Sequence, residues 1–322
     1  MHLPSPTRLA DTIMDRTLLG YSSLGYAARR GFWPPDPPPG ALTGKTAIVT
    51  GAKGGLGKAA ALGLARLGAR VRIVVRDAAG GRTAADEIAR AVAGAQIVVD
   101  ECDVSLLSDV RRYATGIDEP IHVLVHNAGV MPPERRETAE GNELMLATHV
   151  LGPHLMTALL EPRLAAAAPS RVIWVSSGGM YGQRLRVDDP QYRDSAYQPA
   201  TGYARTKRMQ VVLAGLWAQR LHETSIAVYS MHPGWSDTPG VAASLPRFRA
   251  LARPVLRTPE QGADTIVWLA ASTPAPAGGG FWHDRAARPQ YYLPSTRETA
   301  EDRAAFWDAC QRATAGPGDA AP

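Results

Sequence analysis

Short runs rich in Val and Ile alternate with longer stretches rich in Ala and Leu along most of this chain, from residue 46 onward. The short runs are apolar throughout, which is typical of parallel strands covered on both faces. The longer stretches repeat apolar residues at helical period. This alternation predicts one α/β domain in which helices flank a doubly wound parallel sheet of seven strands. The expected strands are TAIVT, RVRIVV, AQIVV, IHVLV, RVIWV and SIAVYSM, and the expected helices cover 56–67, 82–93, 105–115, 140–161, 203–221 and 259–271.

Segments of different composition flank this domain. PPDPPPG at 34–40 cannot continue a helix, because proline lacks the amide N–H and fixes φ. We therefore expect an N-terminal helical extension with its proline-rich linker at 1–42, and the dinucleotide-binding catalytic domain at 43–290. The remainder, 291–322, is expected to be a C-terminal tail that is loose at its end.

The N-terminal extension carries apolar residues, among them Leu9, Ile13 and Leu24, at loosely helical spacing between arginines. Two interpretations stay open. The helix packs on the domain or on a partner subunit, or it makes a peripheral contact with a membrane surface. The extension has no uninterrupted apolar core or cleavage site, so it is not expected to be a secretory signal.

Charge and cysteine content narrow the function classes. The formal net charge of +5 is spread along the chain without a basic block, which argues against nucleic acid as a partner and suits an anionic cofactor. The two cysteines make no disulfide framework, and neither they nor the histidines show metal-ligand spacing. We expect no metal and a cytoplasmic location, with attachment to a membrane left open.

A glycine-rich turn joins the first expected strand to the first expected helix. Gly51, Gly55 and Gly57 lie there with the spacing TGxxxGxG. Glycines in such a turn let backbone N–H groups approach a pyrophosphate at a helix N-terminus. We expect this loop, including Leu56, to contact a dinucleotide; a glycine-rich turn without a ligand is the alternative.

The second strand ends in VVRD. An acid at this edge suits the ribose hydroxyls of NAD, whereas a basic side chain suits a 2′-phosphate. Arg76 occupies the edge, and Lys53 in the glycine loop adds positive charge. These residues favour NADP(H) over NAD(H). Asp77 keeps NAD open, and a solvated strand-end arginine is the plain alternative for Arg76.

The third strand ends in DECDVS. Asp103 is placed where a carboxylate could accept a hydrogen bond from an adenine amino group, and Val104 could pack on the ring. The alternative is that Asp103 caps the following helix together with Ser105.

The fourth strand ends in HNAG. Asn127, Ala128 and Gly129 fit a sharp turn beneath a cofactor. The alternative is turn chemistry alone.

The fifth strand ends in VSSGG and is followed by GYARTK. Ser176 and Ser177 lie at the carboxyl edge of the sheet, where ligands bind. Tyr203 and Lys207 stand one helical turn apart on the same face. A nearby ammonium is expected to lower the pKa of the tyrosine, so that Tyr203 exchanges a proton with a substrate oxygen held by Ser177. This chemistry matches hydride transfer from a nicotinamide.

Together these motifs resemble the short-chain dehydrogenases/reductases, over residues 43–285. The resemblance implies a Rossmann fold in which the three glycines bind the phosphates and Asn127 supports the turn under the cofactor. It assigns Ser177 and Tyr203 to catalysis, with Ser176 as the alternative serine, and Lys207 to the nicotinamide ribose and the tyrosine. The stretch HPGWSDTPG is similar to the family's motif after the sixth strand and adds Pro233, Gly234 and Thr238 on the nicotinamide side.

His149 departs from the family pattern, which has asparagine at this place. In relatives the backbone carbonyl of that asparagine holds a water that leads to the lysine, and the side chain supports a helix distortion. We count His149 with the catalytic residues and leave three interpretations open: a tolerated substitution, a weakened proton relay, or a direct substrate contact.

The segment between Ser177 and Tyr203 and residues 239–258 are expected to form walls over the substrate. Their apolar residues and the N-terminal helix favour a lipophilic carbonyl or alcohol as the small-molecule substrate. Assembly into a homo-oligomer is left open. The rival functions are an NADP-binding sensor or scaffold with little turnover, for which His149 is the support, and an epimerase or dehydratase, against which the glycine spacing argues.

Overall fold

The computed structural model describes the whole chain except residues 1–10, 13, 16, 245 and 317–322. Leu9 and Ile13 of the expected N-terminal helix, and the end of the expected tail, lie outside the described residues. The described strands are β1 Thr46–Thr50, β2 Arg70–Val75, β3 Gln96–Glu101, β4 Val123–His126, β5 Ser170–Val175, β6 Ile226–Met231, β7 Phe281–His283 and β8 Ala286–Arg288.

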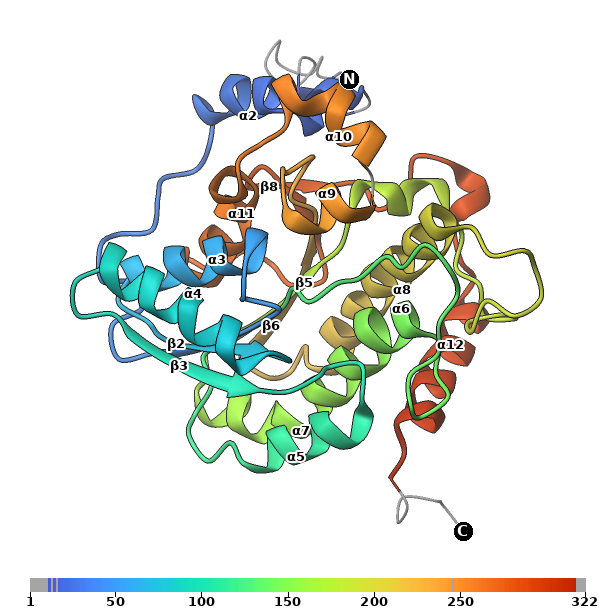
Figure 1. Cartoon of the computed structure of the whole chain (residues 1–322), viewed down its shortest axis with the longest axis horizontal. Helices are drawn as coiled ribbons and strands as arrows, with labels where there is room; N and C mark the ends of the chain where they lie inside the picture. Colours follow the sequence, from blue (N-terminus) through green and yellow to red (C-terminus); the bar gives the residue numbers. More distant parts are fainter. Residues whose placement is uncertain (1–10, 13, 16, 245, 317–322) are drawn as a thin grey trace.

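Helices lie on both faces of this sheet (Figure 1). The longer ones are α2 Ser23–Arg30, α3 Gly55–Arg66, α4 Ala78–Ala91, α5 Leu107–Thr115, α7 Gly152–Ala166, α8 Pro199–Arg220, α11 Pro259–Ala271 and α12 Ala300–Thr314. The shorter ones are η1 Leu18–Tyr21, α6 Leu144–Leu146, η2 Ala147–Leu151, η3 Gly178–Gly182, α9 Pro239–Ser244, α10 Pro246–Ala252, η4 Arg253–Val255 and η5 Pro294–Thr296. No helix in the described part of the chain is long and apolar enough to cross a bilayer.

The doubly wound α/β fold is confirmed. Among the described residues the sheet has eight strands in the order β3-β2-β1-β4-β5-β6-β7-β8, and every pair except β7–β8 is parallel. The chain changes its direction of winding between β1 and β4, which places a topological switch point at their carboxyl ends. The cofactor motifs found in the sequence all follow strands that end at this edge.

Both faces of the central strands are buried, as their continuous apolar runs predicted. Ile48 of β1 packs into the apolar cluster that contains residues of α5, α7, α8 and α12. Its neighbour Val49 packs into the cluster on the other face, with residues of α3 and α11. Because successive side chains of a strand point to opposite faces, both positions must be apolar.

The hairpin β7–β8 adds an antiparallel strand that the expected seven do not include. Each of its strands is three residues long, and the tight turn between them uses Asp284 and Arg285 at φ of 51° and 56°. Such turns usually carry glycine or asparagine, which reach positive φ at little cost. The sequence therefore offered neither a strand-length apolar run nor a turn signal.

The segment expected to be a tail contains helix α12, which packs on the domain. Its residues Phe306, Trp307 and Cys310 are buried in the same cluster as α7 and α8. Thr299 caps the helix by accepting a hydrogen bond from the Asp302 amide at 3.1 Å. The boundary of the catalytic domain at 290 stays a prediction.

Candidate active site

The glycine loop is fixed to the turn after β4. Gly51 has a φ of +68°, and a Cβ at this position would lie 2.7 Å from the Cα of Ala128, so only glycine fits. The side-chain amide of Asn127 donates to the carbonyl of Thr50 at 2.9 Å and to that of Gly51 at 3.3 Å. A Cβ on Gly57 would overlap the same amide. The N-terminus of α3 therefore lies at the carboxyl edge of the sheet. Its glycine backbone is compact there, which suits the binding of a pyrophosphate.

Two charged residues, Arg76 and Asp77, follow the carboxyl end of β2, and only the carboxylate of Asp77 has partners among the described residues. Arg76 is exposed and, within the described part of the chain, makes no hydrogen bond or ion pair. Asp77 accepts from the Gly80 amide at 3.1 Å, which caps α4, and pairs with the Lys53 ammonium at 3.0 Å. The positive charge of Lys53 is thus paired with Asp77, and a contact of Lys53 with a cofactor stays a prediction.

At the end of β3, the Asp103 carboxylate is engaged by Ser105, two residues further along the chain, and it does not cap α5, whose N-cap is Leu106 without a side-chain cap. Its Oδ1 accepts from the amide of Ser105 at 2.9 Å and from the hydroxyl of Ser105 at 2.7 Å. Val104 is buried beside it. A contact of either residue with adenine stays a prediction.

The two serines after β5 have different surroundings. The hydroxyl of Ser176 is buried and donates to the backbone carbonyl of Lys207 at 2.8 Å, which is a structural contact between β5 and α8. Ser177 is half-buried; its hydroxyl accepts from the amide of Gly179 at 3.3 Å, and the serine lies near enough to Tyr203 to lower the pKa of the phenol. These contacts favour Ser177 over Ser176 as the serine that can meet a substrate oxygen.

The pKa of Tyr203 differs from the expectation. Burial raises this pKa to about 12, and the nearby Ser177 side chain offsets only part of the rise. The ammonium of Lys207 lies 5.2 Å from the centre of the Tyr203 ring but does not bring the pKa below its ordinary value. The prediction of a lowered tyrosine pKa is therefore wrong for the protein without cofactor. Burial of the phenol has the larger effect.

Lys207 is itself buried, with 2% of its surface exposed. Its ammonium donates to the carbonyl of Val175 and to Oε1 of Gln210, each at 2.9 Å. Burial lowers the pKa of Lys207 to about 7. A lysine in this state changes its charge near neutral pH, which is typical of functional sites.

His149 lies in a π-helical turn, Ala147–Leu151, so the helix distortion persists without asparagine. Its Nε2 accepts from the amide of Val130 at 3.0 Å. Burial holds the pKa of His149 well below its usual value, so the neutral ring carries its proton on Nδ1 and donates to Thr206 Oγ1 at 2.7 Å. With both nitrogens engaged by protein groups, the arrangement favours a tolerated substitution over a direct substrate contact.

Gln210 is a site residue that the sequence analysis missed. Its Nε2 donates to the backbone carbonyl of His149 at 2.9 Å, while its Oε1 accepts from Lys207. The side chain is 1% exposed and thus joins the π-helical turn directly to the lysine. Its position three residues after Lys207, on the same helical face, was the only signal in the sequence.

The loop after β6 places Pro233 and Gly234 at the carboxyl edge of the sheet, followed by Trp235 and Thr238. The carbonyl of Thr238 accepts a hydrogen bond from the amide of Ala242, and this bond belongs to the first turn of α9. Figure 1 shows α9 and α10 above this edge of the sheet, on the same side as α2. Within the described residues, no group of three or more His, Cys, Asp or Glu side chains is arranged to hold a metal ion.

Known proteins share this sequence and architecture. The family model described as short chain dehydrogenase matches residues 45–247. Dehydrogenase/reductase SDR family member 12 from Bos taurus is 39% identical over 284 residues, which are 87% of this chain and 89% of that protein. The stretches VSSGGMYGQRL and MHPGWSDTPGV carry a resemblance to this relative.

Two further comparisons bear on ligands. Retinol dehydrogenase 12 from Bos taurus is 36% identical over 249 residues, covering 76% of this chain and 78% of that protein. The Pseudomonas aeruginosa RhlG/NADP active-site complex is 25% identical with a TM-score of 0.63, covering 76% of this chain and 96% of that chain.

Proposed function

Because the chain belongs to the short-chain dehydrogenase family of NAD(P)-dependent oxidoreductases, we propose that it interconverts a lipophilic carbonyl and its alcohol with NADP(H), through Ser177, Tyr203 and Lys207. The observation that carries the proposal is the placement of Tyr203 and the buried Lys207 one helical turn apart on α8, with the Lys207 ammonium 5.2 Å from the centre of the Tyr203 ring. The bound nicotinamide would supply the hydride in reduction and accept it in oxidation.

In reduction, Ser177 holds the substrate oxygen and Tyr203 gives it a proton. A phenol with a pKa of about 12 is protonated at neutral pH, which is the form that a general acid needs. Lys207 stabilises the phenolate left behind, and the phenolate then takes a proton from solvent. Oxidation requires the phenolate first and is therefore favoured at higher pH.

The choice of NADP(H) is supported by the edge of β2. Arg76 is exposed without a described partner, whereas the carboxylate of Asp77 is engaged by Lys53 and the Gly80 amide. Arg76 can therefore meet a 2′-phosphate, while Asp77 is less available to ribose hydroxyls. The RhlG relative was solved with NADP. Paired titrations should show tighter binding of NADPH than of NADH, and Arg76→Ala should remove the difference; tighter NADH binding would refute this assignment.

A lipophilic substrate and a peripheral membrane contact are supported by exposed apolar residues at one end of the molecule. Leu24 of α2 is 63% exposed, Phe32 is 75% exposed and Leu251 of α10 is 86% exposed. Figure 1 shows α2 and α10 at the same end of the molecule. Sedimentation with anionic liposomes should recover the wild type, and the double variant Leu24→Glu, Phe32→Glu should stay in the supernatant. Equal recovery of both would remove the membrane proposal.

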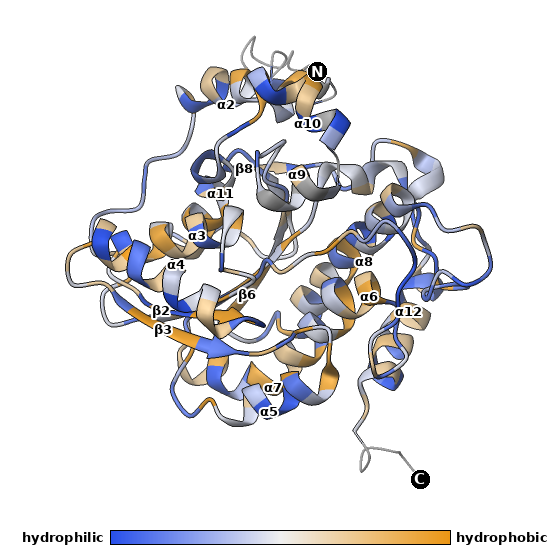
Figure 2. Cartoon of the chain, in the orientation of Figure 1, coloured by the Kyte–Doolittle hydropathy of each residue, from blue (hydrophilic) through white to orange (hydrophobic). Residues whose placement is uncertain are grey.

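The substrate walls are proposed to include the segment between η3 and α8, most of which Figure 2 colours as hydrophilic. Tyr197 in this segment donates to the carbonyl of Pro132 at 3.3 Å, so the segment meets the loop after β4. The function is tested by following NADPH absorbance over a panel of aldehydes, ketones and sterols. Reduction of at least one carbonyl is expected. Cofactor binding without turnover across the panel would favour the sensor hypothesis instead.

A further inference from the structure

The N-terminal segment is built into the loops that surround the nicotinamide side of the proposed site. The carbonyl of Tyr21, in η1, accepts from the amide of Trp235 at 2.8 Å. The Tyr21 ring stands edge-on to His232, with centroids 4.6 Å apart, and to Trp235 at 6.0 Å. Tyr21 is 8% exposed, so η1 is packed on this loop rather than lying free beside it.

Tyr21 also reaches the turn that carries Ser177. A Cβ added to Gly178 would lie 2.9 Å from Cε2 of the Tyr21 ring. On the other side, Gly234 has a φ of +73°, and a Cβ there would lie 2.7 Å from the Tyr21 carbonyl oxygen. Both loops therefore use glycine where they approach Tyr21, and the residue lies between them.

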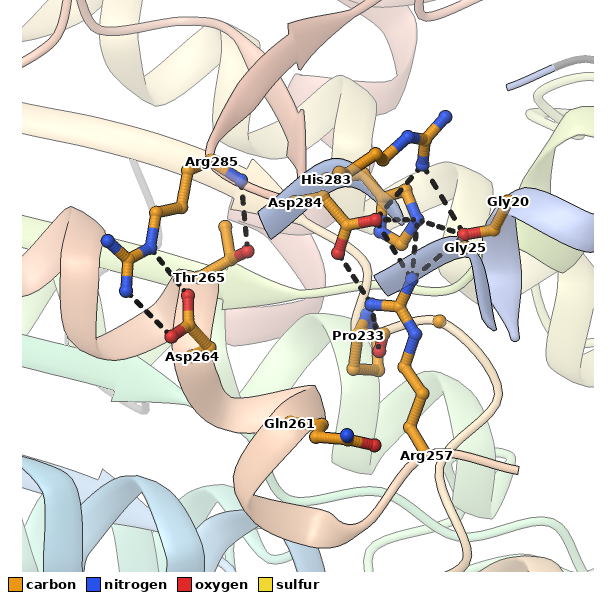
Figure 3. Close-up of polar contacts among 12 residues, drawn as sticks. Gly20, Gly25, Pro233, Arg257, Gln261, Asp264, Thr265, His283, Asp284 and Arg285 are labelled. Carbon is orange, nitrogen blue, oxygen red and sulfur yellow. Dashed lines mark hydrogen bonds and ion pairs between the residues drawn. The ribbon is translucent and has the colours of Figure 1, made fainter. Parts of the chain in front are cut away.

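A buried ionic cluster holds this arrangement (Figure 3). The Arg257 guanidinium, 1% exposed, donates to both carboxylate oxygens of Asp284, at 2.6 and 2.9 Å. Its other N–H groups donate to the carbonyls of Gly20 at 2.8 Å and Ser22 at 3.2 Å. Arg29 of α2 donates to the same Asp284 at 3.0 Å. Because unpairing a buried charge is costly, the cluster resists separation of η1 and α2 from the domain.

The backbone of Arg257 connects this cluster to the loop after β6. Its amide donates to the carbonyl of Trp235 at 2.7 Å, and its carbonyl accepts from the amide of Asp237 at 2.8 Å. The loop is thus held on one side by Arg257 and on the other by Tyr21. Displacing Tyr21 would leave the loop held on one side only.

We propose that Tyr21 is a positioning residue that sets the separation of the loop 233–238 and the Ser177–Gly178 turn, and so shapes the nicotinamide half of the cofactor site. This inference rests on the proposed function, which gives these loops to the nicotinamide. Arg76 and Asp103 follow β2 and β3, on the opposite side of the switch point from β5 and β6. A change at Tyr21 therefore acts on one half of the cofactor and spares the other.

The test compares two probes, NADPH and 2′-phospho-ADP-ribose, which lacks the nicotinamide. Tyr21→Ala should weaken NADPH binding about tenfold and leave the affinity for the fragment within about twofold. Tyr21→Phe should bind both like the wild type, because the described contacts are made by the ring and the backbone carbonyl. Leu19→Ala, at an exposed position of η1 itself, is the matched control.

Three outcomes overturn the inference. Unchanged binding of both probes by Tyr21→Ala would show that the residue does not position the site. Equal weakening of both probes would show a general structural role. A wild type that binds neither probe would instead refute the proposed cofactor, and this inference with it. If Tyr21→Ala does not fold, Tyr21→Leu is measured in its place with the same expectations.

Discussion

At the scale of single residues, the charge of Lys207 is the most sensitive quantity in the site. The ammonium has two described acceptors, Val175 O and Gln210 Oε1, and almost no solvent. Its pKa of about 7 lies well below the ordinary lysine value, because burial disfavours the charged form. An anionic cofactor bound nearby would favour the charged form of Lys207. Cofactor binding above neutral pH would therefore be coupled to the uptake of a proton by Lys207.

This linkage predicts how cofactor affinity depends on pH. Since the complex binds a proton that the free protein has lost above pH 7, the dissociation constant of NADPH should be nearly constant below pH 7 and rise up to about tenfold per pH unit from about pH 7.5 to 9. Lys207→Met should bind more weakly, with no such rise. The control variant Lys45→Met, at the amino end of β1, should show the same rise of the dissociation constant as the wild type. A wild-type affinity that is flat up to pH 9 would contradict the assignment.

Gln210 should set where that rise begins. Gln210→Met keeps the length of the side chain but removes the acceptor from Lys207, so the pKa of Lys207 should fall and the rise should begin about one pH unit lower. Gln210→Glu places a carboxylate beside the ammonium and should move the rise to higher pH. Titrations of NADPH across pH with both variants check this. Identical profiles in all three proteins would limit Gln210 to a packing role.

At the scale of elements, α12 is a helix that the sequence analysis did not predict. Ala, Pro and Gly are frequent in the stretch before it, and most apolar residues of the helix are alanines, with Phe306 and Trp307 as its large apolar side chains. One of its buried side chains is Trp307, whose ring lies 5.1 Å from that of Trp217 and 3.5 Å from the Arg220 guanidinium.

Truncating this side chain should therefore be costly. Trp307→Ala should lower the free energy of unfolding by about 3–5 kcal/mol, which is typical of a large aromatic side chain removed from a core. Urea unfolding at pH 7.5 measures the change. Arg312→Ala, at an exposed position of the same helix, should change it by less than about 0.5 kcal/mol. A Trp307→Ala protein as stable as the wild type would mean that α12 does not pack as described.

The central elements were predictable because their signal is local. TAIVT and RVRIVV are β1 and β2 to the residue, since short runs rich in Val and Ile favour strands. Helix starts were less accurate. α4 begins at Ala78 rather than 82 because Asp77 caps it, and α8 begins at Pro199 because proline suits a first turn. Capping depends on single side chains, which periodicity does not register.

At the scale of the whole molecule, the candidate site depends on contacts that no local pattern contains. Tyr203 and Lys207 could be named from their spacing, and the glycine loop from its place after a strand. The contact of Tyr21 with Trp235, and that of Arg29 with Asp284, join residues from opposite ends of the chain. Such pairs become visible only when the sheet brings the carboxyl ends of β5, β6 and β7 together.

The interior also predicts the acid sensitivity of the fold. Burial lowers the pKa of six histidines in the described part of the chain: His126 to about 3, His154 to about 4, His149, His232 and His283 well below their usual value, and the partly buried His122 in the same direction. In the unfolded chain they take up protons below about pH 6.5, whereas the folded protein keeps them neutral. Because the unfolded state binds more protons, stability falls as pH drops below 6.5, by up to about 1.4 kcal/mol per pH unit for each histidine.

Urea unfolding between pH 7.5 and 5 checks this expectation. His126→Phe keeps a ring against Trp174 and removes one titrating group, so the pH dependence of stability should become shallower. His222→Gln changes an exposed histidine and should leave the dependence unaltered. A wild-type stability that is constant from pH 7.5 to 5 would show that these histidines do not titrate differently in the two states.

The most direct test of the proposed chemistry is the turnover of Tyr203→Phe. This variant keeps the ring beside Lys207 and removes only the phenol hydroxyl. On any carbonyl that the wild type reduces with NADPH, kcat should fall by about 100-fold or more while the dissociation constant of NADPH changes little. A Tyr203→Phe protein that reduces the same carbonyl at the wild-type rate would show that this phenol is not the acid.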